Sequence, residues 1–153
     1  MAESKRFQVR EMTAGDAAVD GLLGGLGGGI VMGIYLLGVS LLMGESPLVM
    51  LARFAADTQG PTSGALMHLA VSAVYGTLFG LIWSVIGRRW PDKPTVVAGV
   101  VYGLLLWLMA NTLLLPGSAS SLQQIPSPHF AIAHLLYGLT LGYSLHHMWT
   151  DDD

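Results

Sequence analysis

The sequence predicts an all-α integral membrane protein, a four-helix bundle built as two tandem helical hairpins and packed through small residues at four-residue spacing. The chain has 153 residues, of which 52% are hydrophobic and only 11% charged, and its mean hydropathy is +0.57. A globular domain usually has about 25% charged residues. Four apolar stretches lack Asp, Glu, Lys and Arg, and each approaches the ~20 residues that cross a ~30 Å hydrocarbon core. One membrane domain therefore accounts for most of the chain.

Small residues recur every four positions along each apolar stretch, so that they form one stripe on a helix. In water, glycine within a helix costs about 1 kcal/mol relative to alanine, which makes so many helical glycines unfavourable in a soluble protein. In a bilayer, small residues instead let two helix backbones approach closely. The pattern predicts these helix-packing positions: Gly25, Gly29, Gly33, Ser72, Gly76, Gly80, Gly99, Gly103, Gly138 and Gly142, with Gly21 and Ser84 extending two of the stripes.

Hydropathy and turn residues set the bounds of the four predicted transmembrane helices. They cover residues 21–43, 64–87, 95–115 and 128–148 and together form a domain over 21–148. Asp20 is the expected N-cap of the first helix, and Thr95 follows Pro94 at the start of the third. Pro116 and Gly117 are expected to end the third helix, because neither residue continues a helix well.

The basic residues predict the orientation of the chain in the membrane, because cytoplasmic loops carry an excess of Lys and Arg. Only Arg53 falls in a predicted outer loop. The other six precede the first helix or separate the second from the third: Lys5, Arg6, Arg10, Arg88, Arg89 and Lys93. We therefore expect a multi-pass protein of the cell (inner) membrane with both termini cytoplasmic. Residues 1–20 would form a cytoplasmic N-terminal segment and residues 149–153 an acidic cytoplasmic tail.

The two predicted outer loops differ in composition. The first holds Leu48, Leu51 and Ala55 at helical spacing. Its residues 46–56 are predicted to form a short helix lying in the outer membrane interface, with an ordered loop as the alternative. The second outer loop, over 116–128, is uncharged and rich in Ser, Gln and Pro, and we expect it to be irregular and exposed.

The sequence also predicts an internal duplication. The motif YGxxxG at residues 75–80 recurs at 137–142, 62 residues later. The motif GxxxG at 29–33 recurs at 99–103, 70 residues later. Two units that each cross the membrane twice share one orientation, as parallel repeats do. The alternative is a chance recurrence in glycine-rich membrane helices.

Polar residues toward the outer ends of the predicted helices are the candidate ligand site. His68 and His134 fall on the small-residue faces of the second and fourth helices, and Asn111 continues the stripe of the third. The two histidines suit haem b or a metal ion, because imidazole binds both. The competing interpretation is that each histidine packs between helices with its hydrogen bonds satisfied, and that Asn111 bonds one helix to another. A polar path lined by these three residues is a further alternative.

Several classes of function find no support in the sequence. There are no cysteines, no paired carboxylates and no Ser-His-Asp arrangement, so we predict that the chain is not an enzyme. Charged residues are absent from the predicted helices, which argues against a proton-coupled transporter. Seven scattered Lys and Arg residues do not support a nucleic-acid partner. The glycine run over 24–29 follows no predicted strand, so we do not interpret it as a nucleotide-binding loop.

Three segments carry a resemblance to a known family: HLAVSAVYGTLFGLIW, GVVYGLLLWLMANTLLLPG and HFAIAHLLYGLTLGYSL. They are similar to small uncharacterised four-helix membrane proteins of bacteria and archaea, a domain of unknown function. Members share a histidine in the second helix, a Tyr-Gly third helix ending near proline and a His-x-x-Tyr-Gly fourth helix. The resemblance covers roughly residues 21–148 and implies fold and membrane location, but no activity.

These observations lead to one functional expectation and two alternatives. The first is a non-catalytic accessory or structural subunit of a larger membrane complex, or a self-associating scaffold, because not every small-residue stripe can face the bundle centre. Its partners would be the lipid bilayer and other membrane subunits or a second copy, and it would need no cofactor. The second is a small oligomeric transporter or channel with a His/Asn-lined path. The third is a haem b or metal-binding protein that uses His68 and His134.

Overall fold

The computed structural model describes residues 12–55, 60–90 and 94–150, and all regular structure within these ranges is helical. In chain order the elements are α1 (Ala14–Leu42), α2 (Pro47–Ala52), α3 (Pro61–Ile86), η1 (Gly87–Arg89), α4 (Thr95–Met109), η2 (Ala110–Leu114), η3 (Ser121–Gln124) and α5 (Ser127–Thr150). Elements η1 and η3 are short 3₁₀ helices, and η2 is a π-helical continuation of α4. The predicted all-α fold class is confirmed.

Three helices of the described structure are long and apolar enough to cross a membrane: α1, α3 and the continuous helix from Thr95 to Leu114. They correspond to the first three predicted spans. Helix α5 has 24 residues but is less apolar, since four of those residues are histidines. The transmembrane placement of α5 therefore stays a prediction.

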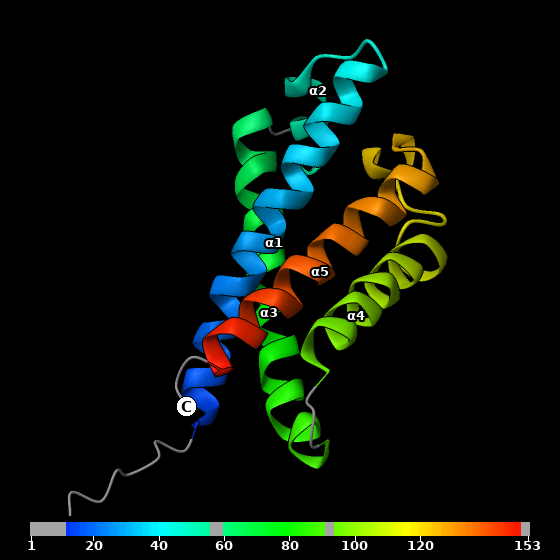
Figure 1. Ribbon diagram of the computed structural model, residues 1–153. Coiled ribbons are helices and arrows are strands. Elements are labelled where there is room, and N and C mark those ends of the chain that lie inside the picture. The colour runs from blue at the N-terminus through cyan, green and yellow to red at the C-terminus, as the bar shows by residue number, and fades with distance from the viewer. Residues whose placement is uncertain (1–11, 56–59, 91–93, 151–153) are drawn as a thin grey trace, which may run out of the picture.

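Helix α1 lies at the centre of the arrangement, in contact with α3 and with α5, and α4 packs on α5 (Figure 1). Helices α3 and α4 scarcely touch each other. The four long helices thus follow one another in space in the order α3, α1, α5, α4. This order leaves room for the cavity between α3 and α4 that is described below.

Helices α1 and α3 pack backbone to backbone through their small residues. A Cβ atom added to Gly25 would lie 2.5 Å from the carbonyl oxygen of Ser72 and 2.8 Å from the Cα atom of Gly76. A Cβ atom on Gly80 would lie 3.0 Å from the Cα atom of Gly21. These neighbours are backbone atoms that cannot rotate away, so even alanine would force the helices apart. Such an approach is what small residues at four-residue spacing allow.

Helices α4 and α5 make a contact of the same kind. A Cβ atom on Gly99 would lie 2.7 Å from the Cα atom of Gly142, and one on Gly103 would lie 3.0 Å from the Cα atom of Gly138. The glycines of both hairpins therefore lie where two helices cross at their closest approach.

The contacts pair the glycines of the two hairpins differently from the sequence prediction. Gly76 lies against Gly21, and Gly138 lies against Gly99. In these contacts Gly21, 78 residues before Gly99, and not Gly29, has the place in the α1–α3 pair that Gly99 has in the α4–α5 pair. The predicted pairing was wrong by about two helical turns, because a long run of glycines at four-residue spacing is compatible with several registers.

Helix α1 also has a second small-residue face, which contacts α5. A Cβ atom on Gly28 would lie 2.8 Å from the carbonyl oxygen of Tyr137, and one on Gly24 would lie 2.8 Å from Cδ1 of Leu145. The glycine run over 24–29 thus serves two helix contacts at once. The contacts give no support to the expectation that a glycine stripe is left for a partner.

Helix α1 begins earlier than predicted. Thr13 is the N-cap: its hydroxyl accepts from the Asp16 amide at 3.1 Å, and the Asp16 carboxylate accepts from the Thr13 amide at 3.0 Å. This capping box satisfies backbone donors that a helix start leaves without partners. The prediction of Asp20 as N-cap was wrong, because Asp20 lies within the helix and its carboxylate accepts from the Trp149 indole at 2.9 Å.

Helix α2 is shorter than the segment 46–56 that was predicted to be helical, and residue 56 lies outside the described part of the chain. One side of α2 is buried. Met50 is fully buried, and Arg53 just after the helix is only 6% exposed. The Arg53 guanidinium lies 2.8 Å from the carboxylate of Glu45 and donates to Gln124 at 3.3 Å. Arg53 therefore connects the end of α1 with η3 and holds the two outer loops together.

The second outer loop is more ordered than predicted. The Gln123 side-chain amide donates to the carbonyl oxygens of Leu115 and Ser118 at 2.8 and 2.6 Å, and Ile125 is only 4% exposed. Most of the loop is exposed and irregular as predicted, but the 3₁₀ turn η3 and the buried Ile125 were not expected, and Gln123 satisfies a carbonyl group that the end of the preceding helix leaves free. Gly117, with φ +75°, ends that helix as expected.

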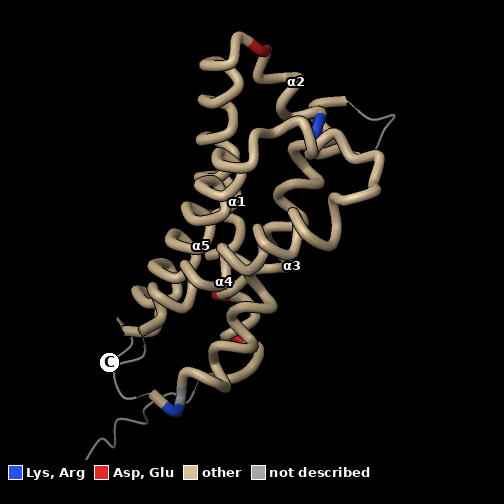
Figure 2. The backbone as a smooth tube through the Cα atoms, turned by 90° about the vertical axis from the view of Figure 1, so that its right-hand side faces the viewer, with Lys and Arg blue, Asp and Glu red and all other residues tan. Residues whose placement is uncertain are grey.

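Described charged residues lie toward the two ends of the molecule, and the middle of the helices carries none (Figure 2). Large apolar side chains cover the outward faces: Leu42 is 87% exposed and Ile34 is 64% exposed. Wide exposed apolar surface is typical of a membrane or protein contact. Four of the basic residues on which the orientation depends lie outside the described ranges: Lys5, Arg6, Arg10 and Lys93.

Candidate functional site

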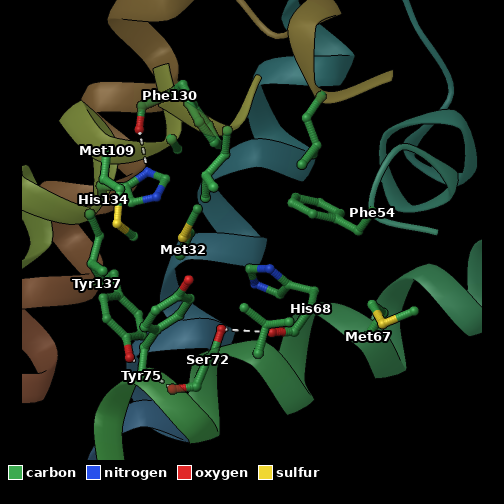
Figure 3. A pocket seen from close by; sticks show the side chains of 15 residues that line it. Met32, Phe54, Met67, His68, Ser72, Tyr75, Met109, Phe130, His134 and Tyr137 are labelled. Carbon is green, nitrogen blue, oxygen red and sulfur yellow. Dashed lines mark hydrogen bonds between the residues drawn. The ribbon is translucent and has the colours of Figure 1, made fainter. Parts of the chain in front are cut away.

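A cavity of about 210 Å³ lies between α3 and α4, with further walls from α1 and α5 (Figure 3). Phe54, just after α2, and Leu122 of η3 contribute to its lining from the two loops that are predicted to lie outside. Pockets for drug-sized ligands occupy about 300–1,000 Å³, so this cavity suits something smaller. Its lining is mostly apolar and aromatic, and both predicted histidines belong to it.

His68 is held on α3 by a contact with α1. The Nε2 atom lies 2.8 Å from the carbonyl oxygen of Gly29, at the close approach of the two helices. The ring of Phe54 packs against the imidazole with ring centroids 4.5 Å apart. Figure 3 shows the imidazole directed into the cavity.

His134 reaches the same cavity from α5. The Nδ1 atom lies 2.9 Å from the carbonyl oxygen of Phe130, one turn earlier on the helix, and the two rings meet edge to face with centroids 4.4 Å apart. Gly103 of α4 lies directly against the His134 carbonyl group. The glycine contact between α4 and α5 therefore sets the depth at which this imidazole enters the cavity.

The two backbone carbonyl groups determine which nitrogen of each imidazole carries the proton. A carbonyl oxygen only accepts, so His68 donates through Nε2 and His134 donates through Nδ1. In a neutral imidazole the other nitrogen is an acceptor with a lone pair. Nδ1 of His68 and Nε2 of His134 are therefore the nitrogens left for a metal ion or for a donor group of a ligand.

Hydrogen bonds between helices hold the walls of the cavity in place. Within α3, the Ser72 hydroxyl donates to the His68 carbonyl oxygen at 2.7 Å, and two further bonds join different helices. The Tyr137 hydroxyl donates to the Ser72 carbonyl oxygen at 2.8 Å, which connects α5 with α3. The Tyr102 hydroxyl donates to the Tyr75 carbonyl oxygen at 2.9 Å, which connects α4 with α3. The imidazoles thus project from a scaffold that is fixed on three sides.

Three methionines also line the cavity, and the sequence pattern did not distinguish them. Met32, Met67 and Met109 come from α1, α3 and α4. In Figure 3 the Met32 thioether points into the cavity between the two imidazoles. Methionine is a common filler of apolar interiors, so composition does not mark these residues. The adjacency of Met67 to His68 is the one signal in the sequence.

Asn111 does not line the cavity with the histidines. Its side-chain amide donates to the Ser127 hydroxyl at 2.8 Å and so connects η2 with the start of α5. This bond between helices agrees with the competing interpretation of Asn111 rather than with a shared polar path.

In the π-helical turn, the Leu115 amide donates to the Ala110 carbonyl oxygen at 2.9 Å, and Ala110 lines the cavity. Such turns are frequent at functional sites.

The cavity of about 210 Å³ is smaller than the pockets of about 300–1,000 Å³ that hold drug-sized ligands, so haem b, which is larger than such ligands, would extend beyond it. Within the described residues, no three His, Cys, Asp or Glu side chains gather in a group that could hold a metal ion. A metal ion bound by the two imidazoles would need ligands of another kind.

Fold and cavity together define an all-helical protein with three membrane-capable helices and a pair of histidines in one cavity. The model of a family of unknown function (DUF6789) matches residues 15–153, so the chain belongs to this family. The match confirms the resemblance to an uncharacterised domain of unknown function. Comparison with curated proteins and with solved structures found no match.

Proposed function

We propose that this chain is a non-catalytic integral membrane protein of four transmembrane helices that binds a small ligand in the cavity between α3 and α4. The observation that carries the proposal is the pair of imidazole acceptors on His68 and His134 in a mostly apolar, aromatic cavity. In such surroundings water competes weakly, so a few polar groups hold a complementary ligand firmly. No carboxylate or lysine stands among the lining residues that the structure describes, which supports binding over catalysis.

The length and packing of α5 support a fourth membrane span. Its 24 residues extend about 36 Å at 1.5 Å per residue, more than the ~30 Å hydrocarbon core. It packs along both α1 and α4. His134, about two turns into α5, lines the cavity instead of the outer surface, so its polarity does not oppose insertion of the helix.

The matching contacts of the two hairpins support a duplication with parallel repeats. Gly76 and Gly138 are equivalent at an offset of 62 residues, and Gly21 and Gly99 are equivalent at an offset of 78. In each hairpin two antiparallel helices cross through small residues at four-residue spacing. Repeats of this type are related by an axis along the membrane normal.

Cysteine labelling tests the proposed orientation, with both termini cytoplasmic. The chain has no cysteine, so single substitutions give an unambiguous signal. Ala119, after η2, and Thr150, at the end of α5, are both exposed. On intact cells a membrane-impermeant maleimide should label Ala119→Cys and should label Thr150→Cys only after the membrane is opened. Labelling of both on intact cells would contradict a membrane-spanning α5.

Filling the cavity tests ligand binding. Val71 lines the cavity and is 45% exposed, so a larger side chain reaches the cavity without entering a helix contact. Val71→Phe should displace the ligand, whereas Val74→Phe, at a 59% exposed position outside the lining, is the matched control. Protein purified in nanodiscs from its own membranes is measured by native mass spectrometry. Absence of a bound species in wild type, or equal retention in both variants, would refute the proposal.

The roles of accessory subunit, scaffold and oligomeric channel stay predictions, and the same preparation tests them. A stoichiometric membrane partner would favour an accessory subunit, and a defined homo-oligomer would favour a scaffold or channel. Two arguments for these roles are weaker in the structure. The glycine stripes are used in contacts within the chain instead of being left for a partner. The Asn111 side chain bonds to Ser127 instead of lining a path with the histidines.

A further inference from the structure

The tautomers of the two histidines restrict what the cavity can bind. The carbonyl oxygens of Gly29 and Phe130 occupy one ring nitrogen each, at 2.8 and 2.9 Å. In the neutral imidazoles the nitrogens left over present lone pairs, which bind a cation or accept from a hydrogen-bond donor of a ligand. An imidazole whose second nitrogen is bonded to a backbone carbonyl is typical of histidines that bind metal ions, because that bond sets the tautomer and the ring orientation.

Thioether sulfur atoms supply the further ligands that a metal ion would need. The chain has eight methionines, and three of them come from three different helices to this one cavity: Met32, Met67 and Met109. Figure 3 shows the thioethers of Met32 and Met109 near the His134 side of the cavity. Methionine has three rotatable bonds, so the sulfur can adjust to an ion. Thioether sulfur is a soft ligand and selects Cu(I), whereas imidazole binds several metals.

The charge of the cavity favours the same ion. No carboxylate lines it among the residues that the structure describes, and Ca²⁺ and Mg²⁺ depend on oxygen ligands. A divalent ion would also carry two uncompensated charges into a mostly apolar site, where desolvation is costly. Monovalent Cu(I) carries one charge, which four neutral nitrogen and sulfur ligands can accommodate.

We propose that one Cu(I) ion binds in this cavity, and the proposed ligands are His68, His134, Met32 and Met109. The inference rests on the proposed function, since it names the ligand class of the same cavity. Met67 also lines the cavity but is 42% exposed, so it is not included among the proposed ligands.

Methionine-to-leucine variants test the proposal, because this exchange nearly conserves side-chain volume. Met32→Leu and Met109→Leu remove one thioether each, and Met50→Leu is the control at a fully buried position outside the cavity lining. Cu(I) is titrated anaerobically into protein in nanodiscs against a chromophoric Cu(I) chelator. We expect one ion per chain in wild type. Each ligand variant should lose Cu(I) affinity by about tenfold or more, because the loss of a group that only supports a metal ligand already costs about that much. The control Met50→Leu should bind Cu(I) as wild type does.

A second measurement separates a metal ligand from a packing residue. X-ray absorption of the bound copper should show both nitrogen and sulfur neighbours, with fewer sulfur neighbours in Met32→Leu. Elution volume in size-exclusion chromatography checks that each variant is folded. Equal Cu(I) affinity in wild type and both ligand variants, or copper without sulfur neighbours, would overturn the proposal.

The outcomes also separate this inference from the proposed function. If Cu(I) does not bind but an organic species is retained by wild type and lost in Val71→Phe, the copper site fails and the binding cavity stands. If neither copper nor an organic species is retained, both proposals fail.

Discussion

Gly99 tests the close packing of α4 on α5, because only the absence of a side chain lets the two backbones meet there. A Cβ atom at this position would lie 2.7 Å from the Cα atom and 2.8 Å from the amide nitrogen of Gly142. It would also meet the carbonyl oxygen of Gly138. Gly99→Ala therefore has to move the helices apart by at least 0.7 Å, the difference between 2.7 Å and the 3.4 Å at which ordinary contact begins.

The cost of this displacement can be bounded. A radial gap of 0.5–1 Å forfeits about a quarter to a half of the dispersion energy of each affected atom pair. Overpacking of a well-packed interior costs about 1–3 kcal/mol in total. Alanine gains up to about 1 kcal/mol over glycine in a helix, which offsets part of this loss. We expect Gly99→Ala to lower the free energy of unfolding by about 1–2 kcal/mol.

The free energy of unfolding is measured in mixed micelles by titration with sodium dodecyl sulfate, with the fluorescence of the four tryptophans as the signal. Gly38→Ala is the matched control on α1, because nothing lies within 4 Å of the Cβ atom that it adds. It should leave stability unchanged or raise it by up to about 1 kcal/mol. If both substitutions change stability in the same direction and by similar amounts, close packing at Gly99 is refuted.

Two further substitutions probe contacts at the ends of the helices by the same assay. Trp149→Phe removes the indole donor of the 2.9 Å bond to Asp20 and should cost about 1 kcal/mol. Unchanged stability would show that this bond contributes nothing. Arg53→Met removes the partner of Glu45, whose carboxylate lies 2.8 Å away and is 30% exposed. We expect a loss of about 2 kcal/mol, less than for a fully buried pair because the Glu45 side chain is partly exposed. The Arg53→Met/Glu45→Gln double variant should recover part of that loss, and strictly additive losses would speak against the pairing.

The end of a helix could be predicted from sequence where one residue forces the backbone out of the helical conformation. It could not be predicted from hydropathy where the helix continues beyond its apolar residues. Pro116 and Gly117 mark the end of the third helix, and Gly117 adopts the left-handed conformation that favours glycine. Hydropathy places the start of the first helix at the first apolar residues, but α1 begins seven residues before the predicted span, at Ala14. The signal was present in Thr13-x-x-Asp16, the spacing of a capping box.

The candidate site could be predicted in part. His68 and His134 stand out because polar residues are rare in apolar helices, and both line the cavity. The thioethers do not stand out, because methionine is as apolar as its neighbours and only the fold brings three helices together. Asn111 also stands out, but its bond to Ser127 depends on the course of the loop between them, which no periodicity determines.

The cavity itself follows from a difference between the two halves of the proposed duplication. Gly24 and Gly28 let α5 lie directly against α1. Seventy-eight residues later, the equivalent positions on α4 are Tyr102 and Leu106. The Tyr102 hydroxyl reaches the Tyr75 carbonyl oxygen on α3 at 2.9 Å, and Leu106 lines the cavity. Glycine thus brings two helices together on one side of the molecule, while larger side chains hold α3 and α4 apart on the other. In the proposed duplication, two small-to-large differences thus coincide with the change from a helix contact to a space that imidazoles and thioethers line.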